Sequence, residues 1–307
     1  MKYRDYKMTP FYKLRYENVN GYNLFIKRDD LYPIIGGGNK GRKLDYILLD
    51  CLNKGCDAVV TCGGIQSNHN RATAIKCKEL GLECTIIIHS NPIKKLSGNL
   101  KILELLGVNI VYCSLKNISS IMDNEMKILE KKGFKPYYIW GGGHSYEGTL
   151  AYFNAVKELR KQTEVNFDIV FLASGTGATQ AGLHCGFKYY YPNTNVYGIS
   201  VARKKEKGKI EIIKTIQHFI SQNKLDNSYL EDVIFDDRFN CGGYEKTNIE
   251  QLNLIKHVAQ KYGVILDPTY TSKAWMGMNY FMKNNILPAN SNILFWHTGG
   301  LLNLMAQ

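Results

Sequence analysis

The chain has 307 residues, of which 45% are hydrophobic and 21% are charged, and only seven are proline. This composition is typical of a folded globular protein and excludes disordered and fibrous chains. The length suffices for two domains of roughly 150 residues each, with a cleft between them. The formal net charge of +12 is scattered along the chain, so it indicates neither a nucleic acid nor a membrane as a partner.

The cysteines and the apolar segments indicate the compartment, and the plain reading favours a protein of the reducing cytoplasm. The eight cysteines form neither a C-x-x-C pair nor a zinc-type Cys/His spacing, so free thiols are expected and a metal is not. Residues 1–7 lack the apolar core of a signal peptide, and no window approaches the ~20 apolar residues of a membrane span. The densest basic run, residues 203–209, is expected to be a solvated loop.

Short β-rich runs alternate along the chain with amphipathic segments whose apolar residues recur every three to four positions. Such alternation is typical of parallel sheets with helices on both faces. We detect no internal repeat and no flexible linker. The expected strands, in chain order, are residues 23–27, 58–62, 84–89, 109–113, 137–140, 168–173, 195–200 and 292–296.

Glycine clusters follow several of these strands, where an expected helix begins. In open α/β sheets ligands bind at the carboxyl ends of the strands. Any single cluster could be a tight turn, but together they favour one shared cleft. The clusters are residues 36–38, 63–64, 141–143, 175–177 and 299–300.

Residues 174–182, Ser-Gly-Thr-Gly-Ala-Thr-Gln-Ala-Gly, follow an apolar strand and open a helix. Small residues at a helix N-terminus let backbone N–H groups and two Thr hydroxyls converge on an anion. The segment lacks the Lys of a P-loop, and Gln180 replaces the third Gly of the dinucleotide fingerprint. It therefore favours a compact phosphate ester over a nucleotide.

A second glycine turn precedes the polar run Gln66-Ser67-Asn68-His69-Asn70. Ser67 and Asn68 alone could simply cap a helix. Five polar residues in succession would also suit a carboxylate together with a ring hydroxyl. One phosphate cradle and one carboxylate cradle fit a phosphorylated cofactor that meets an amino or keto acid.

Lys40, Arg42 and Lys43 crowd the first turn of an expected helix, where positive charge opposes the helix dipole. Residues that are locally unfavourable, such as cations at a helix N-terminus, are expected mainly at functional sites. A lysine amine near other positive charge and partly desolvated has a lowered pKa, and only the neutral amine attacks a carbonyl. Lys40 is therefore the Schiff-base candidate. The alternative is three solvated cations, of which Arg42 or Lys43 meets an acid.

Six segments in a fixed order resemble the fold-type-II pyridoxal-phosphate enzymes, within them the D-cysteine desulfhydrases and aminocyclopropane carboxylate deaminases. They include Gly-Gly-Asn-Lys at 37–40 and Asp-Pro-Thr-Tyr-Thr at 267–271, and they cover nearly the whole chain: residues 26–31, 37–44, 64–69, 174–182, 267–271 and 297–300. The resemblance implies an α/β fold with two open, twisted, mostly parallel sheets flanked by helices, like the tryptophan synthase β subunit. It further implies a homodimer whose large cofactor domain comprises residues 1–43 and 152–307, with 44–151 as a small mobile substrate domain.

The resemblance also assigns roles. Lys40 would hold pyridoxal 5′-phosphate as a Schiff base, and the phosphate would be bound by Gly175, Thr176, Gly177, Ala178 and Thr179. Asn68 would bond the ring hydroxyl, and the substrate carboxylate would be received by Ser67, Asn68 and His69. Tyr244 and Tyr270 match the family's two active-site tyrosines, although from the residues alone ordinary packing aromatics are favoured among 21 Tyr.

Two positions indicate the reaction. Family members that open the cyclopropane ring usually carry Glu and Leu where this chain has Thr271 and Thr298, and desulfhydrases carry Ser or Thr at both. A neutral hydroxyl beside the pyridine nitrogen makes the ring a weaker electron sink, which suits β-elimination. The implied function is a lyase that converts a small, D-cysteine-like amino acid into pyruvate, ammonia and sulfide. Ring opening, racemisation, β-replacement, a nicotinamide-dependent oxidoreductase and a non-catalytic binding protein remain the alternatives.

The chain also departs from the family pattern. Glu245 to Asn248 stand where the family usually has Gly-x-Pro-Asn, and Leu301-Leu302-Asn303 replace small residues and Pro. Trp275 and Trp296 are bulky residues close to two motifs, so a reshaped pocket is expected. His297 is either a catalytic base or, as is commoner beside a Gly pair, a packed residue.

Overall fold

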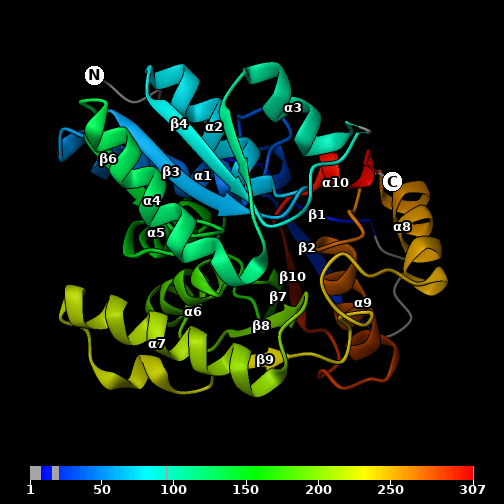
Figure 1. The fold of residues 1–307 in the computed structure, drawn as a ribbon. Coiled ribbons are helices and arrows are strands. Elements are labelled where there is room, and N and C mark those ends of the chain that lie inside the picture. The colour runs from blue at the N-terminus through cyan, green and yellow to red at the C-terminus, as the bar shows by residue number, and fades with distance from the viewer. Residues whose placement is uncertain (1–7, 16–20, 95, 307) are drawn as a thin grey trace.

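The computed structural model describes residues 8–15, 21–94 and 96–306. The expectation drawn from residues 1–7 therefore lies outside the described residues. The fold is α/β with two sheets, as expected. Figure 1 shows the four-stranded sheet in the upper half of the molecule, with β7, β8 and β9 of the six-stranded sheet below it.

The six-stranded sheet is parallel except for its first strand, which pairs antiparallel with the second. In spatial order its strands are β1 (Phe11–Lys13), β2 (Asn23–Arg28), β10 (Asn292–His297), β7 (Ile169–Ser174), β8 (Asn195–Ser200) and β9 (Ile234–Asp236). The four-stranded sheet is entirely parallel, in the order β5 (Asn109–Tyr112), β4 (Glu83–Ile88), β3 (Ala58–Gly63) and β6 (Pro136–Ile139).

All eight strands expected from the sequence are present, with ends that differ by at most two residues. The sequence reasoning missed β1 and β9, which have three residues each and are too short to show a period. The run at 203–209 is not a loop throughout. Lys205 begins a helix, whose first residues are solvent-exposed.

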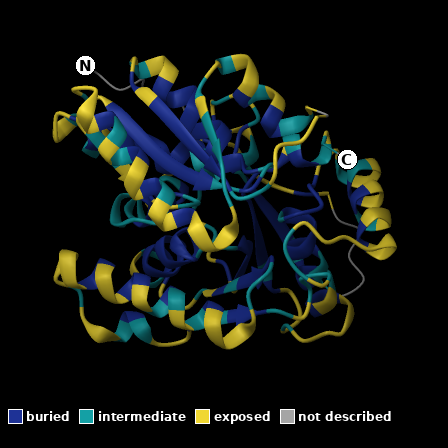
Figure 2. Cartoon of the chain, in the orientation of Figure 1, coloured by how far each residue is buried: buried dark blue, intermediate teal, exposed yellow. Residues whose placement is uncertain are grey.

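Helices cover both faces of each sheet, and this explains why the strands are apolar on both sides. Val59 of β3 packs with α1, α2 and α3, whereas its neighbours Ala58 and Val60 pack with α4 on the opposite face. The same alternation places Phe171 of β7 against α8 and α9, and Leu172 against α5 and α6. Buried residues accordingly run along the strands, and exposed residues gather on the outer helices (Figure 2).

The helices are α1 (Asn39–Asn53), α2 (Asn68–Leu80), α3 (Gly98–Leu106), α4 (Ile118–Lys131), α5 (Tyr146–Gln162), α6 (Ala178–Tyr190), α7 (Lys205–Asn223), α8 (Ile249–Tyr262), α9 (Thr271–Lys283) and α10 (Leu301–Leu304). Short 3-10 turns occupy Asp29–Leu31, Leu115–Asn117 and Asn227–Leu230. None of the helices in the described part of the chain has the length and hydrophobicity that crossing a bilayer requires. All four strands of the smaller sheet lie inside the segment predicted to be the small domain, and the domain boundaries themselves stay a prediction.

Candidate active site

A cavity of about 330 Å³ opens where strands of both sheets end. It is lined by the residues that follow β3, β6, β7, β8 and β10, together with the start of α1 and two tyrosines. This is the edge at which α/β sheets bind ligands, and the volume suits a small molecule. Four of the five glycine clusters therefore contribute to one cleft, as the sequence indicated, and the fifth, residues 36–38, lies outside the described lining and directly precedes Asn39 and Lys40, which line it.

Lys40 is the second residue of α1 and lines this cavity. The turn before it needs Gly38, whose φ of 101° is unfavourable for other residues and whose added Cβ would lie 3.0 Å from the Thr298 carbonyl oxygen. The Lys40 Nζ donates to the Gly142 carbonyl oxygen at 3.0 Å. Burial lowers the pKa of Lys40 to about 8, so a substantial share of the amine is neutral near physiological pH.

The other two cations of this turn have separate environments. Arg42 meets two acids, because its guanidinium lies 2.7 Å from Asp29 and 2.7 Å from Glu158. Lys43 instead donates to the same Gly142 oxygen as Lys40, at 3.2 Å. Burial and the charge of Lys40 hold the pKa of Lys43 well below its usual range. Arg42 thus meets an acid, as the alternative allowed, but Arg42 and Lys43 are buried rather than solvated, and the ion pairs of Arg42 fix the helix that carries Lys40.

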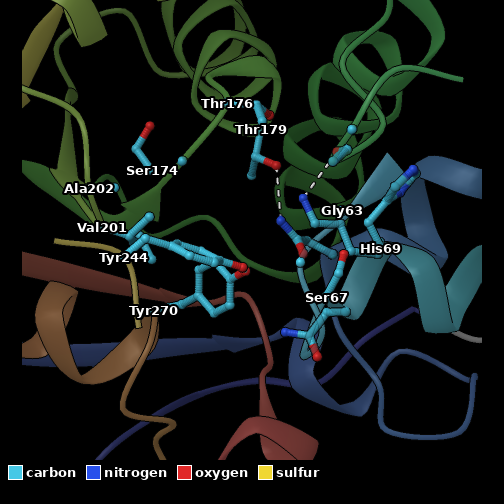
Figure 3. Close-up of a pocket in the computed structure, with 18 of the residues that line it drawn as sticks. Gly63, Ser67, His69, Ser174, Thr176, Thr179, Val201, Ala202, Tyr244 and Tyr270 are labelled. Atoms are coloured by element: carbon cyan, nitrogen blue, oxygen red, sulfur yellow. Dashed lines mark hydrogen bonds between the residues drawn. The ribbon is translucent and has the colours of Figure 1, made fainter. Parts of the chain in front are cut away.

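The segment after β7 has the features of a phosphate cradle. Gly175, Thr176, Gly177 and Thr179 line the cavity, and Ala178 begins α6 just behind them. The Thr179 hydroxyl accepts a hydrogen bond from Asn39 Nδ2 at 3.1 Å, so its own proton is free to donate to an anion. Figure 3 shows Thr176 and Thr179 together on one side of the cavity.

Arg203, assigned to a solvated loop from the sequence, lines the cavity and supports this cradle. Its Nη1 donates to the carbonyl oxygens of Gly175 and Thr176, at 3.2 and 3.0 Å. Because a trans peptide directs its C=O and N–H to opposite sides, the N–H groups of Thr176 and Gly177 point away from Arg203. They remain available to an anion.

The second cradle lies at the start of α2. Ser67 caps this helix by accepting from the Asn70 N–H at 3.2 Å, and it also lines the cavity. The capping role is confirmed, and the binding of a carboxylate stays a prediction. Asn99 Nδ2 donates to Asn68 Oδ1 at 3.0 Å, which leaves the Asn68 NH₂ group available to a ligand.

His69 also lines the cavity, and its tautomer follows from Thr61. The Thr61 hydroxyl donates its one proton to the Ile139 carbonyl oxygen at 2.7 Å, so at 2.8 Å it accepts from His69 Nε2–H. Burial together with the charges of Lys40 and Lys43 lowers the pKa of His69 well below its usual range. The ring is therefore neutral, and its buried Nδ1, which has no partner among the described residues, is an acceptor. A carboxylate would be received by Ser67 and the backbone N–H groups of α2 rather than by this nitrogen.

Tyr244 and Tyr270 lie next to each other, on the side of the cavity opposite the second cradle (Figure 3). Their hydroxyl oxygens are 2.6 Å apart. Burial raises the pKa of both phenols, so both remain protonated at neutral pH. One O–H bonds the other ring's oxygen, and the second O–H can donate into the cavity.

The two threonines that indicated the reaction differ in position. Thr298 lines the cavity. Thr271 is fully buried and lies outside the lining formed by the described residues. Its hydroxyl donates to Asp267 Oδ1 at 2.7 Å and accepts from the Asp267 N–H at 2.8 Å, so both of its roles are used. Only Thr298 is in a position to contact a bound cofactor.

Two of the residues expected to reshape the pocket, Trp275 and Trp296, lie outside the described cavity lining. Trp275 packs against Tyr262 and Phe295 in the core. Trp296 donates its Nε1–H to Asp29 at 3.0 Å on the face of the sheet that carries α5. His297 is a packed residue, because one ring nitrogen contacts the Ile265 carbonyl oxygen at 2.9 Å and the other accepts from the Gly299 N–H.

The comparisons identify the family. The model of the pyridoxal-phosphate dependent enzymes matches residues 3–299, and the chain belongs to this family. Pyridoxal 5′-phosphate is therefore its cofactor. The residues fit this group, since Lys40 lines the cavity with an amine of lowered pKa and the Thr179 proton is free. The buried Ser174 hydroxyl, which lines the cavity and has no partner among the described residues, is a further free polar group.

Two relatives are similar along nearly their whole length. The chain is 39% identical to a putative 1-aminocyclopropane-1-carboxylate deaminase of Thermotoga maritima, over 98% of this chain and 96% of the relative. It is 35% identical to a D-cysteine desulfhydrase of Yersinia enterocolitica, over 97% and 93%. A solved structure described as an ACC deaminase homologue aligns with a TM-score of 0.89 at 33% identity, over 97% of this chain and 91% of that one.

Proposed function

We propose that this protein is a lyase that eliminates the β substituent of a small, D-cysteine-like amino acid. The products are pyruvate, ammonia and the leaving group, which is sulfide for cysteine. The competing reaction is ring opening of aminocyclopropane carboxylate, after which one relative is named.

The observation that carries this choice is that no acid, neither Asp nor Glu, is found among the described residues lining the cavity. Thr298, whose side chain carries a neutral hydroxyl, lines the cavity beside the turn that precedes Lys40, where its carbonyl oxygen accepts from the Asn39 N–H. Pyridoxal phosphate supplies an electron-withdrawing ring that stabilises negative charge on the substrate Cα. Without a carboxylate to keep a proton on the pyridine nitrogen, this withdrawal is weaker. A reaction in which a good leaving group departs depends less on it than ring opening does.

The side chains of the cavity divide the remaining work. The Lys40 amine would hold the cofactor and, once released from it, take the proton from Cα, a role that a pKa of about 8 suits. The phosphate would be held by Thr176, Thr179 and the N-terminus of α6. The substrate carboxylate would bind Ser67 and the N-terminus of α2, and this fixes the orientation of the Cα–H bond.

The tyrosine pair would assist the leaving group. A thiolate leaving from Cβ gains from a nearby proton donor, and Tyr244 with Tyr270 holds one O–H that is not used between the rings. Because burial raises the pKa of both phenols, this proton is retained at neutral pH. The pair is thus suited to donate a hydrogen bond to sulfur or to another departing atom.

Parallel keto-acid assays on the purified, cofactor-loaded protein test the proposal. D-cysteine and 3-chloro-D-alanine should give pyruvate and ammonia, and aminocyclopropane carboxylate should give little 2-oxobutyrate. The Lys40→Ala variant is the control for uncatalysed release. Efficient 2-oxobutyrate release would overturn the argument from Thr298. An absence of any keto acid, despite a visible cofactor absorbance, would favour racemisation or β-replacement.

The same proposal includes the setting of the enzyme. Its eight cysteines are all free, which agrees with a reducing compartment, and we propose a cytoplasmic location. We further propose a homodimer and a small domain of residues 44–151 that moves against the rest. Light scattering of the holoenzyme and hydrogen exchange with and without substrate would test these two points.

A further inference from the structure

Two polar side chains from distant parts of the chain, His89 and Glu245, both lie close to Gly64, a residue of the cavity lining. His89 directly follows β4 and also lines the cavity, and Glu245 directly follows Tyr244. A Cβ added at Gly64 would lie 3.5 Å from His89 Cε1 and 3.7 Å from Glu245 Oε1. Glu245 is solvent-exposed, so the two side chains stand at the rim of the cavity rather than in its depth.

The backbone just before Glu245 is held in place by contacts to Lys273 and Tyr270. The buried Lys273 of α9 donates its Nζ to the Gly243 carbonyl oxygen at 2.7 Å and to that of Val201 at 3.1 Å. Tyr244 is fixed in turn by its hydrogen bond to Tyr270. Glu245 then adopts a left-handed φ of 59°, which is uncommon for a residue other than glycine. The loop is thus anchored at the two residues directly before Glu245, whose carboxylate oxygen lies near Gly64.

The carboxylate brings negative charge to the rim of a cavity whose described lining residues include neither Asp nor Glu. Arg203 and Lys40 supply cations inside the cavity. The positively charged or titratable groups that act on Glu245 are His89 and Lys273, and the Lys273 ammonium is engaged with two carbonyl oxygens. Glu245 also lies next to the tyrosine pair, which we assign to the leaving group. Its charge therefore acts on what the substrate carries at Cβ.

We propose that Glu245, together with His89, selects the substrate by its β substituent. The pair favours a substituent that is cationic or donates hydrogen bonds, such as the β-ammonium of 2,3-diaminopropionate, and it disfavours an anionic one. This inference rests on the proposed β-elimination and names the substrate class of that same site.

The reaction balances without an oxidant or reductant. The Cα–H bond breaks and its proton passes to Lys40, while the electron pair left on Cα forms the Cα–Cβ double bond. The bond from Cβ to the ammonium nitrogen breaks, and ammonia departs with the electron pair of that Cβ–N bond. Water then replaces the α-amino nitrogen, so one 2,3-diaminopropionate and one water give pyruvate and two ammonia.

Three substrates with different charge at Cβ test the proposal: 2,3-diaminopropionate, 3-chloroalanine and serine O-sulfate. Binding to the cofactor-loaded enzyme is followed by the change in visible absorbance, which gives Kd without turnover, and pyruvate release gives kcat/KM. The wild type should prefer the cationic substrate to the anionic one by about fivefold or more in Kd, as expected for one partly exposed ion pair of about 1 kcal/mol.

Glu245→Gln should remove this preference and change Kd for 3-chloroalanine by less than about twofold, since only the charge is lost. Glu250→Gln is the matched control, because it removes an exposed carboxylate from the first turn of α8 outside the cavity lining. An unchanged cation-to-anion ratio in Glu245→Gln, or a wild type that prefers serine O-sulfate, would overturn the inference. Selective binding without pyruvate from any of the three substrates would refute the lyase and leave the selection by Glu245 standing.

Discussion

Replacing Thr179 by Val should weaken the binding of pyridoxal phosphate while leaving the fold intact. Val has nearly the volume of Thr, but the variant loses the hydroxyl that accepts from Asn39 Nδ2 and has its proton free for an anion. A hydrogen bond from a neutral donor to a charged phosphate contributes about 1.5–3 kcal/mol. The predicted loss is therefore about 10- to 150-fold in cofactor Kd.

Titration of the cofactor-free protein with pyridoxal phosphate, followed by visible absorbance, measures this loss. Thr194→Val is the matched control, because its hydroxyl donates to the Phe167 carbonyl oxygen and it lies outside the cavity lining formed by the described residues. The control should bind the cofactor as the wild type does. The double change of Thr176 and Thr179 to Val should bind it more weakly than either single variant. Wild-type affinity in the double variant would show that the phosphate lies elsewhere.

Three further outcomes follow from the first turn of α1. Lys40→Ala should abolish turnover and the borohydride-reducible cofactor linkage, and a pyridoxyl group mapped to Lys27 or Lys43 would contradict the assignment. Arg42→Met leaves the buried Asp29 without its closest cation and should lower the free energy of unfolding by about 3–5 kcal/mol in urea titrations, whereas a loss below about 1 kcal/mol would refute the role of this ion pair. In the cofactor-free protein, the lowered pKa of Lys40 means that the unfolded chain binds more protons between about pH 8 and 10.5, so stability due to this group rises with pH there. Lys40→Met should accordingly be more stable than the wild type below pH 8 and lose that advantage towards pH 10.5; an advantage independent of pH would contradict the buried, shifted amine.

The sheets could be predicted from the sequence because most of their strands are five or more residues long and apolar on both faces. The pattern at residues 168–173 predicts β7 almost residue for residue, since Phe171 and Leu172 pack on opposite helix layers. By contrast, β1 and β9 have three residues each, and their pairing with a neighbouring strand defines them. A single sequence carries no signal of that pairing.

The site was predictable where the chemistry is local and unpredictable where partners are distant. Three cations at one helix start pointed to Lys40, which lines the cavity, but the sequence could not show that Arg42 pairs with Glu158, which lies 116 residues away. Arg203 was misassigned because its role depends on two carbonyl oxygens of a different loop. The position of Thr271 was also hidden, since only the folded turn brings its hydroxyl to Asp267.

A competition in one tube tests the central claim most directly. Equal concentrations of 3-chloro-D-alanine and aminocyclopropane carboxylate are given to the cofactor-loaded enzyme, and pyruvate and 2-oxobutyrate are measured together by proton NMR. The ratio of the two products reports the ratio of the two kcat/KM values. The cavity without an acidic residue in its described lining, with Thr298 as its neutral hydroxyl, predicts that pyruvate dominates. An excess of 2-oxobutyrate would contradict the account.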